Sequence, residues 1–133
     1  MGFLDRKKHK VEKNKNLVTS FMHAYDGIKY AVVKERNMHI HVVMAILVMF
    51  FGAIFRLSRI EWFICLILIG LVIAFELINT AIEACVDLST TNENDLARIA
   101  KDVSAGAVLV VSFISALIGL AIFLPRLFDF LGF

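Results

Sequence analysis

Long runs of uncharged apolar residues constrain this chain more than any other feature. Residues 103–124 contain no Asp, Glu, Lys or Arg over 22 positions, and residues 62–75 contain none over 14. A helix crosses the hydrocarbon core of a bilayer, ~30 Å thick, with about 20 apolar residues. The whole chain is 59% hydrophobic with a mean hydropathy of +0.79. We therefore expect an all-α integral membrane protein of one domain, residues 1–133.

Three transmembrane spans are expected, at residues 38–55, 62–87 and 103–124. Before them lie a basic tail, residues 1–16, and residues 17–34, whose apolar side chains recur at helical spacing. This pattern is typical of an amphipathic helix at the membrane surface, although packing on other protein is an alternative. A polar loop is expected over residues 88–100, and Pro125 is expected to follow the last span.

The distribution of Lys and Arg predicts the orientation. Residues 1–36 hold nine of them and residues 88–102 hold two, whereas the other side of the membrane would hold only Arg56, Arg59 and Arg126. Cytoplasmic loops carry the excess of Lys and Arg. The N-terminus and the second loop are therefore expected in the cytoplasm of a bacterial cell, with the chain in the plasma membrane.

The second span ends in a polar stripe. Glu76, Asn79, Glu83 and Asp87 stand at offsets of 0, 3, 7 and 11, which places them on one face of a helix. Ionisable groups at membrane depth are costly and are read as functional by default. This face is therefore the expected site of the chemistry, and it opens toward the cytoplasm.

Other polar residues are expected at the same membrane level. Lys101 and Asp102 begin the third span, and Glu35 precedes the first. Two carboxylates can hold Mg²⁺, which also binds phosphate, and a lysine can sit against phosphate oxygens. A deeper carboxylate, here Glu76, can act as general base. These groups are what phosphoryl transfer needs.

Other interpretations remain open at this stage. The acidic stripe also fits a proton or cation pathway or a purely structural role in helix assembly. Zinc is disfavoured because, among the candidate ligands, only Glu35 and His39 are expected to share a helical face, and no third ligand is spaced to join them. No GxxxxGK[ST] or GxGxxG motif is present to cradle phosphates, and no nucleic-acid partner is expected.

Three helices cannot enclose a polar site in lipid, so a homo-oligomer with sites completed between subunits is expected.

The residues of the stripe resemble a known family. Glu-Leu-Ile-Asn-Thr-Ala-Ile-Glu over residues 76–83, Val-Asp at 86–87, Ala-Lys-Asp at 100–102 and Ala-Gly-Ala at 105–107 are similar to the prokaryotic diacylglycerol kinase family. Glu-Arg-Asn at 35–37 also fits. The Val-Asp-Leu and Ala-Gly-Ala segments are closer to the Gram-positive branch, whose members tend to phosphorylate undecaprenol.

This resemblance implies a homotrimeric bundle of three-span subunits that transfers the γ-phosphoryl group of ATP to a lipid alcohol with Mg²⁺. It implies that Glu76 is the general base and that Glu35 and Glu83 hold the metal and nucleotide. Asn79, Lys101 and Asp102 match nucleotide-site residues, and Asp87 matches a family position whose role is less clear. Undecaprenol is the expected acceptor, and diacylglycerol is the alternative.

Two features depart from the family pattern or extend it. His39 stands where an Arg is expected, and His23 stands in the surface helix where relatives carry an aromatic or hydroxyl-bearing residue, so the roles of both positions stay open. Residues Asn92, Glu93 and Asn94 match no motif. They are predicted to line the adenine and ribose only because their loop lies between Glu83 and Lys101.

Overall fold

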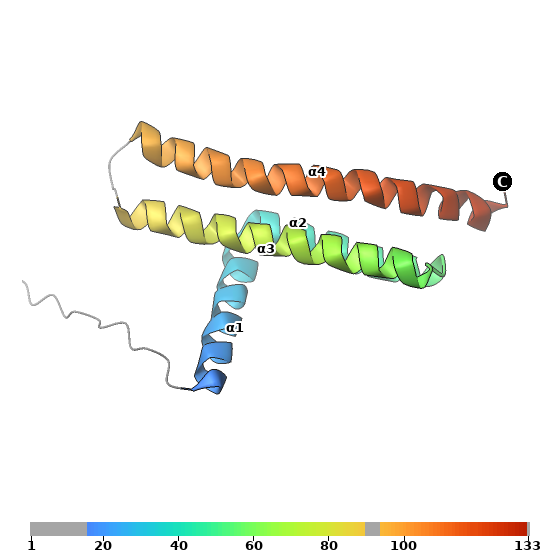
Figure 1. Cartoon of the computed structure of the whole chain (residues 1–133), viewed down its shortest axis with the longest axis horizontal. Coiled ribbons are helices and arrows are strands. Elements are labelled where there is room, and N and C mark those ends of the chain that lie inside the picture. Colours follow the sequence, from blue (N-terminus) through green and yellow to red (C-terminus); the bar gives the residue numbers. More distant parts are fainter. Residues whose placement is uncertain (1–15, 90–93, 133) are drawn as a thin grey trace, which may run out of the picture.

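The computed structural model describes residues 16–89 and 94–132, and these residues are almost entirely helical (Figure 1). Four helices follow one another: α1 (Leu17–Lys34), α2 (Arg36–Ile54), α3 (Arg59–Ser89) and α4 (Asp95–Leu131). The first coincides with the amphipathic helix expected at residues 17–34. The all-α fold class predicted from the apolar runs is confirmed.

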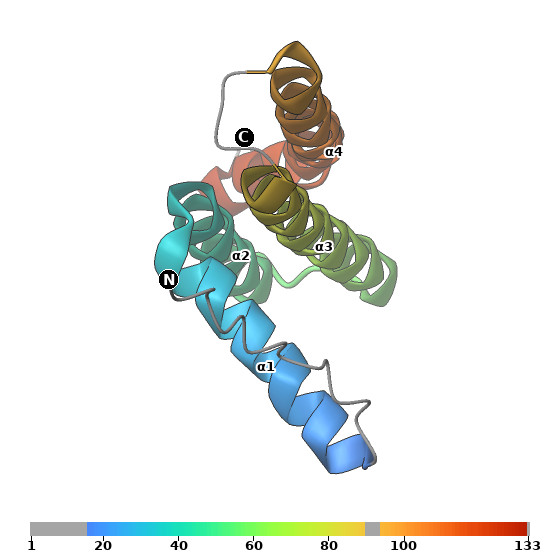
Figure 2. The same ribbon diagram turned by 90° about the vertical axis from the view of Figure 1, so that its left-hand side faces the viewer.

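The three long helices lie side by side, and α1 leaves the start of α2 at a steep angle, part of the way along α3 (Figures 1 and 2). Helix α3 is the central element, because it packs against both α2 and α4, and α1 also reaches it. The stripe carried by α3 is thus placed where every other helix can contribute to it.

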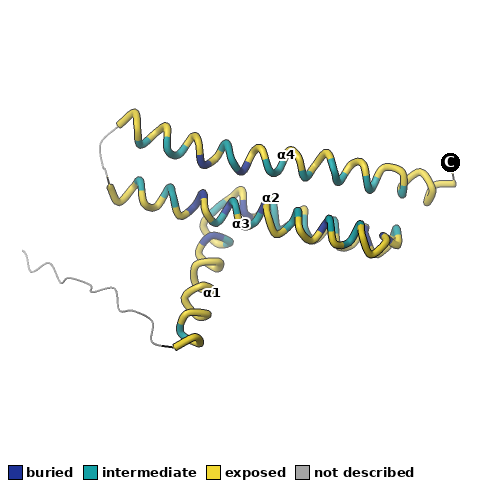
Figure 3. The backbone as a smooth tube through the Cα atoms, in the orientation of Figure 1, coloured by how far each residue is buried: buried dark blue, intermediate teal, exposed yellow. Residues whose placement is uncertain are grey.

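Helices α2, α3 and α4 are each long and apolar enough to cross a membrane. Most of their large apolar side chains are exposed, as the predominance of outward-facing positions in Figure 3 shows. Leu109 and Phe113, for example, expose 70% and 62% of their surface. An apolar surface of this extent needs lipid or other protein to cover it, as expected for membrane helices.

The helices extend beyond the predicted spans. Helix α3 has 31 residues and α4 has 37, which at 1.5 Å per residue gives roughly 45 and 55 Å against a hydrocarbon core of ~30 Å. Both therefore project into the polar region at their ends. Pro125, expected after the last span, lies inside α4.

The predicted loop of residues 88–100 is wrong in extent, because α3 continues to Ser89 and α4 begins at Asp95. Asn94 explains the early start of α4. Its side-chain oxygen accepts hydrogen bonds from the backbone N–H groups of Leu96 at 2.8 Å and Ala97 at 3.3 Å. An N-cap of this kind satisfies donors that the first turn leaves unpaired.

Glu35 forms the sharp junction between α1 and α2. Its backbone is extended, with φ −94° and ψ 119°, yet its N–H donates to the carbonyl of Ala31 at 2.9 Å and its carbonyl accepts from His39 at 3.4 Å. Both helices are thus capped by one residue. Because Glu35 is not helical, the helical face that it was expected to share with His39 does not exist.

The opposite end of the bundle is held by polar contacts between α3 and α4. Ser58 and Glu61 bond reciprocally, with the N–H of Ser58 donating to the Glu61 carboxylate at 2.7 Å and the N–H of Glu61 donating to Ser58 Oγ at 3.3 Å. This is a capping box. Arg126 donates to the same carboxylate at 2.7 and 3.3 Å, which fixes the start of α3 to the end of α4.

Candidate active site

The polar stripe of α3 runs from the protein interior to its surface. Glu76 and Asn79 are buried, with 1% and 5% of their surface exposed, Glu83 is half-buried and Asp87 is exposed. The helical spacing read from the sequence therefore places the four residues on one face. Their burial divides them into an inner pair, Glu76 and Asn79, and an outer pair, Glu83 and Asp87.

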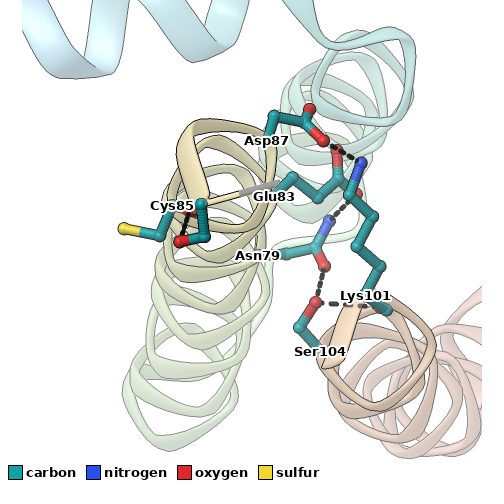
Figure 4. Close-up of polar contacts among 7 residues, drawn as sticks. Asn79, Glu83, Cys85, Asp87, Lys101 and Ser104 are labelled. Atoms are coloured by element: carbon teal, nitrogen blue, oxygen red, sulfur yellow. Dashed lines mark hydrogen bonds and ion pairs between the residues drawn. The ribbon is translucent and has the colours of Figure 1, made fainter. Parts of the chain in front are cut away.

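A chain of hydrogen bonds joins this stripe to α4 (Figure 4). Ser104 Oγ donates to Asn79 Oδ1 at 2.6 Å, and Asn79 Nδ2 donates to Glu83 Oε1 at 3.0 Å. Further out, Lys101 Nζ donates to Asp87 Oδ1 at 2.5 Å. The expectation that Lys101 returns to the level of Asp87 is confirmed.

Ser104 was not among the predicted residues. It is 7% exposed and also lies 2.9 Å from the carbonyl of Lys101. The sequence does carry a weak signal for it, because Ser104 follows Lys101 by one helical turn and so shares its face. The Asn79 oxygen accepts the hydrogen bond from Ser104, and this orients the Asn79 amide with its N–H groups toward Glu83.

The Glu76 carboxylate is the most unusual group in the structure. Both of its oxygens are buried, and neither has a hydrogen-bond partner among the described residues. Glu83 lies two helical turns away on the same face of α3. Nearly all buried polar groups are hydrogen-bonded, so an unpartnered one calls for an explanation. A buried carboxylate with free lone pairs is suited to accept a proton.

One side chain does approach Glu76 from another helix. His41 Nε2 of α2 lies 3.9 Å from Glu76 Oε2, with the His41 side chain 17% exposed. His41 was not among the predicted site residues. Nothing in the local sequence pairs it with Glu76, because 35 positions separate the two residues.

Two other predicted residues, Asp102 and Asn94, take no part in this chain of hydrogen bonds. Asp102 is exposed, and its carboxylate lies 3.6 Å from Arg98 of the same helix. Asn94 uses its side-chain oxygen to cap α4. Asn92 and Glu93 lie outside the described residues. The predicted contacts of Asn92 and Glu93 with adenine and ribose therefore stay a prediction.

The donor set favours phosphate chemistry over a metal site made by protein alone. Within residues 16–89 and 94–132, no group of three or more His, Cys, Asp and Glu side chains is arranged to hold a metal ion. The site instead combines separate carboxylates, an oriented amide and a lysine, all at one end of the bundle. Such a set suits a substrate that brings its own oxygen ligands.

Comparison with known proteins agrees with this chemistry. Residues 22–123 match the family model for prokaryotic diacylglycerol kinase. The undecaprenol kinase of Bacillus subtilis is 47% identical over 124 residues, which cover 93% of this chain and 100% of that protein. A diacylglycerol kinase of Synechocystis is 36% identical over 84% of this chain and 65% of that protein. A diacylglycerol kinase of Helicobacter pylori is 29% identical over 72% of this chain and 75% of that protein.

The matched region contains α2, α3 and most of α1, together with α4 up to Phe123. It therefore includes every described residue of the site. A kinase of this type uses ATP as co-substrate and a membrane lipid as acceptor, which accounts for a polar site at the end of three membrane-crossing helices. This chain is therefore a member of the prokaryotic diacylglycerol kinase family and a membrane-bound lipid kinase.

Proposed function

We propose that this protein transfers the γ-phosphoryl group of ATP to the hydroxyl of undecaprenol and forms undecaprenyl phosphate. The observation that carries the proposal is the buried, unpartnered carboxylate of Glu76 beside a Lys- and amide-bearing polar face. The acceptor is chosen because the undecaprenol kinase of Bacillus subtilis aligns over its full length at 47% identity. Diacylglycerol is the alternative acceptor, since two relatives are diacylglycerol kinases.

Glu76 acts as the general base. It lies on the inner part of the stripe, where the hydroxyl of a membrane lipid can reach it and a nucleotide enters less easily. As the lipid oxygen attacks the γ-phosphorus, its O–H proton passes to a Glu76 oxygen and the bond to the ADP oxygen breaks. Because neither Glu76 oxygen has a hydrogen-bond partner in residues 16–89 and 94–132, the carboxylate can meet the hydroxyl directly.

Glu35 and Glu83 are the carboxylates that would hold Mg²⁺. Mg²⁺ in kinases is commonly held by one or two carboxylates together with waters and substrate phosphates, and Glu35 and Glu83 would supply two. When bound, the ion neutralises charge on the β- and γ-phosphate oxygens. Asn79 holds Glu83 at 3.0 Å and so limits the orientations of its carboxylate.

Lys101 and Asp102 supply the outer part of the nucleotide site. In the structure Lys101 Nζ is paired with Asp87, and an exposed pair of this kind is worth little. The ammonium can therefore exchange Asp87 for a phosphate oxygen at small cost. Asp87 then serves to hold Lys101 on the correct side of α4 before ATP arrives.

The orientation and assembly follow from charge and exposed surface. The excess of Lys and Arg at the N-terminal end and around residues 98–101 favours a cytoplasmic site in the bacterial plasma membrane, where ATP is present. A homotrimer, with each site shared between neighbouring subunits, would cover part of the apolar surface that one chain leaves exposed. Its mass would be three times the 15.0 kDa of the chain.

A transfer assay with two acceptors tests the proposal. Purified protein in mixed micelles is given γ-labelled ATP and Mg²⁺, with undecaprenol and diacylglycerol in parallel, and the Glu76→Gln variant serves as the control for enzyme-dependent label. Label mainly on undecaprenol supports the proposal, whereas label mainly on diacylglycerol replaces the acceptor. Label on neither lipid, with the helical fold intact, refutes both. Omission of Mg²⁺ and sedimentation analysis of the same preparation test the metal and the trimer.

A further inference from the structure

His41 has no part in the proposed reaction, yet its ring lies within 4 Å of the Glu76 carboxylate. Its Nε2 lies 3.9 Å from Glu76 Oε2, and the two residues come from different helices, α2 and α3. The structure thus brings together a buried carboxylate that has no hydrogen-bond partner among the described residues and a ring nitrogen able to donate to it.

We infer that His41 is a positioning residue for the general base: its Nε2–H holds Glu76 Oε2 and leaves Oε1 to face the acceptor hydroxyl. This inference rests on the proposed role of Glu76 in lipid phosphorylation. It follows the general arrangement in which a nucleophile meets a base and the base is oriented by a third group.

The distance of 3.9 Å is too long for a hydrogen bond. Catalytic hydrogen bonds are often long before substrate binds and shorten in the complex. A shift of about 1 Å between α2 and α3 brings the two atoms into range. With acceptor lipid bound beside Glu76, we expect His41 to be the donor that the carboxylate requires.

A neutral imidazole is sufficient for this role, because the proton on Nε2 donates whether or not Nδ1 carries a second one. No transfer of charge between the two side chains is involved. The proton removed from the lipid ends on Glu76, and His41 acts only on the direction in which the carboxylate points.

Substitution of His41 by Gln or by Asn tests whether His41 positions Glu76 or only packs against it. The amide nitrogen of Gln takes approximately the place of Nε2, whereas that of Asn is closer to Nδ1 and cannot reach Glu76. His41→Ala and His41→Asn should each lower kcat on the order of 100-fold, as expected when a reacting group is misplaced by about 1 Å. His41→Gln should recover at least about tenfold of that loss. The KM for ATP should stay within about twofold in all three.

A double-substitution cycle with Glu76→Asp gives a second readout. The shorter Asp carboxylate cannot meet His41, so His41→Ala should cost no more than about twofold further in that background. Ile46→Ala, a truncation at a position of α2 with 61% of its surface exposed, should leave kcat unchanged and serves as the matched control.

Three results would overturn the inference: a kcat for His41→Ala within twofold of wild type, equal defects in the Gln and Asn variants, or effects of His41→Ala and Glu76→Asp that simply multiply. If wild-type protein labels no lipid, the proposed function itself fails. If wild type is active and Glu76→Gln is not, while His41→Ala remains fully active, only the role of His41 fails.

Discussion

The hydrogen bond between Ser104 and Asn79 is expected to contribute more to stability than its single hydroxyl suggests. Both residues are buried, with 7% and 5% of their surface exposed, and the oxygen atoms lie 2.6 Å apart. Ser104→Ala leaves Asn79 Oδ1 without a donor in a site that water hardly enters. Leaving a buried acceptor unsatisfied costs about 1–3 kcal/mol, and this is the expected decrease in the free energy of unfolding.

The same reasoning predicts that adding Asn79→Leu to Ser104→Ala raises the free energy of unfolding again, although turnover is lost. When both partners are replaced by apolar groups, the net change can be nearly neutral. The Asn79→Leu and Ser104→Ala double variant should therefore be more stable than Ser104→Ala alone. It should still be nearly inactive, because Glu83 loses the amide that holds it at 3.0 Å.

The assay is unfolding of the purified protein in mixed micelles with increasing sodium dodecyl sulfate, followed by far-ultraviolet circular dichroism, with turnover measured on the same samples. Ser115→Ala is the control, since its hydroxyl bonds only the carbonyl of Val111 in its own helix, at 2.7 Å. The reasoning is refuted if Ser104→Ala unfolds at the same point as Ser115→Ala. It is also refuted if the double variant is less stable than Ser104→Ala.

Four further substitutions address the roles of single side chains. Glu76→Gln should abolish turnover while leaving nucleotide binding intact, and titration of binding with a non-hydrolysable ATP analogue checks the second half of this statement. Glu83→Gln should raise the Mg²⁺ concentration needed for half-maximal rate, and an unchanged metal titration would remove Glu83 from the metal site. Lys101→Met should raise the KM for ATP several-fold, because the proposed contact of its ammonium with a phosphate oxygen is lost. The unfolding midpoint should stay unaltered, because the Lys101 side chain is exposed and its partner carboxylate can be hydrated. Arg126→Ala should destabilise the protein by about 1 kcal/mol through loss of the contact with Glu61 and leave kcat unchanged, as steady-state kinetics can verify.

Local patterns were enough to predict the elements and the face that carries the chemistry. Uncharged runs such as residues 103–124 predict membrane helices, because a backbone without water must pair with itself. The helical period likewise places Glu76 and Asn79 together, as their burial bears out. The ends of the helices were predicted less well. Polar turns beyond the membrane remain helical where a cap such as Asn94 supports them, and hydropathy does not detect this.

Sequence patterns could not predict which side chains of different helices contact one another. Periodicity states which residues of one helix share a face, but the rotation and axial shift of one helix against another depend on how their side chains pack. Ser104 and Asn79 are 25 positions apart, and His41 and Glu76 are 35 apart. Their proximity exists only because α2 and α4 both pack on α3. The sequence by itself determined a membrane helix with an acidic stripe, and the tertiary structure decided which side chain of each neighbouring helix meets it.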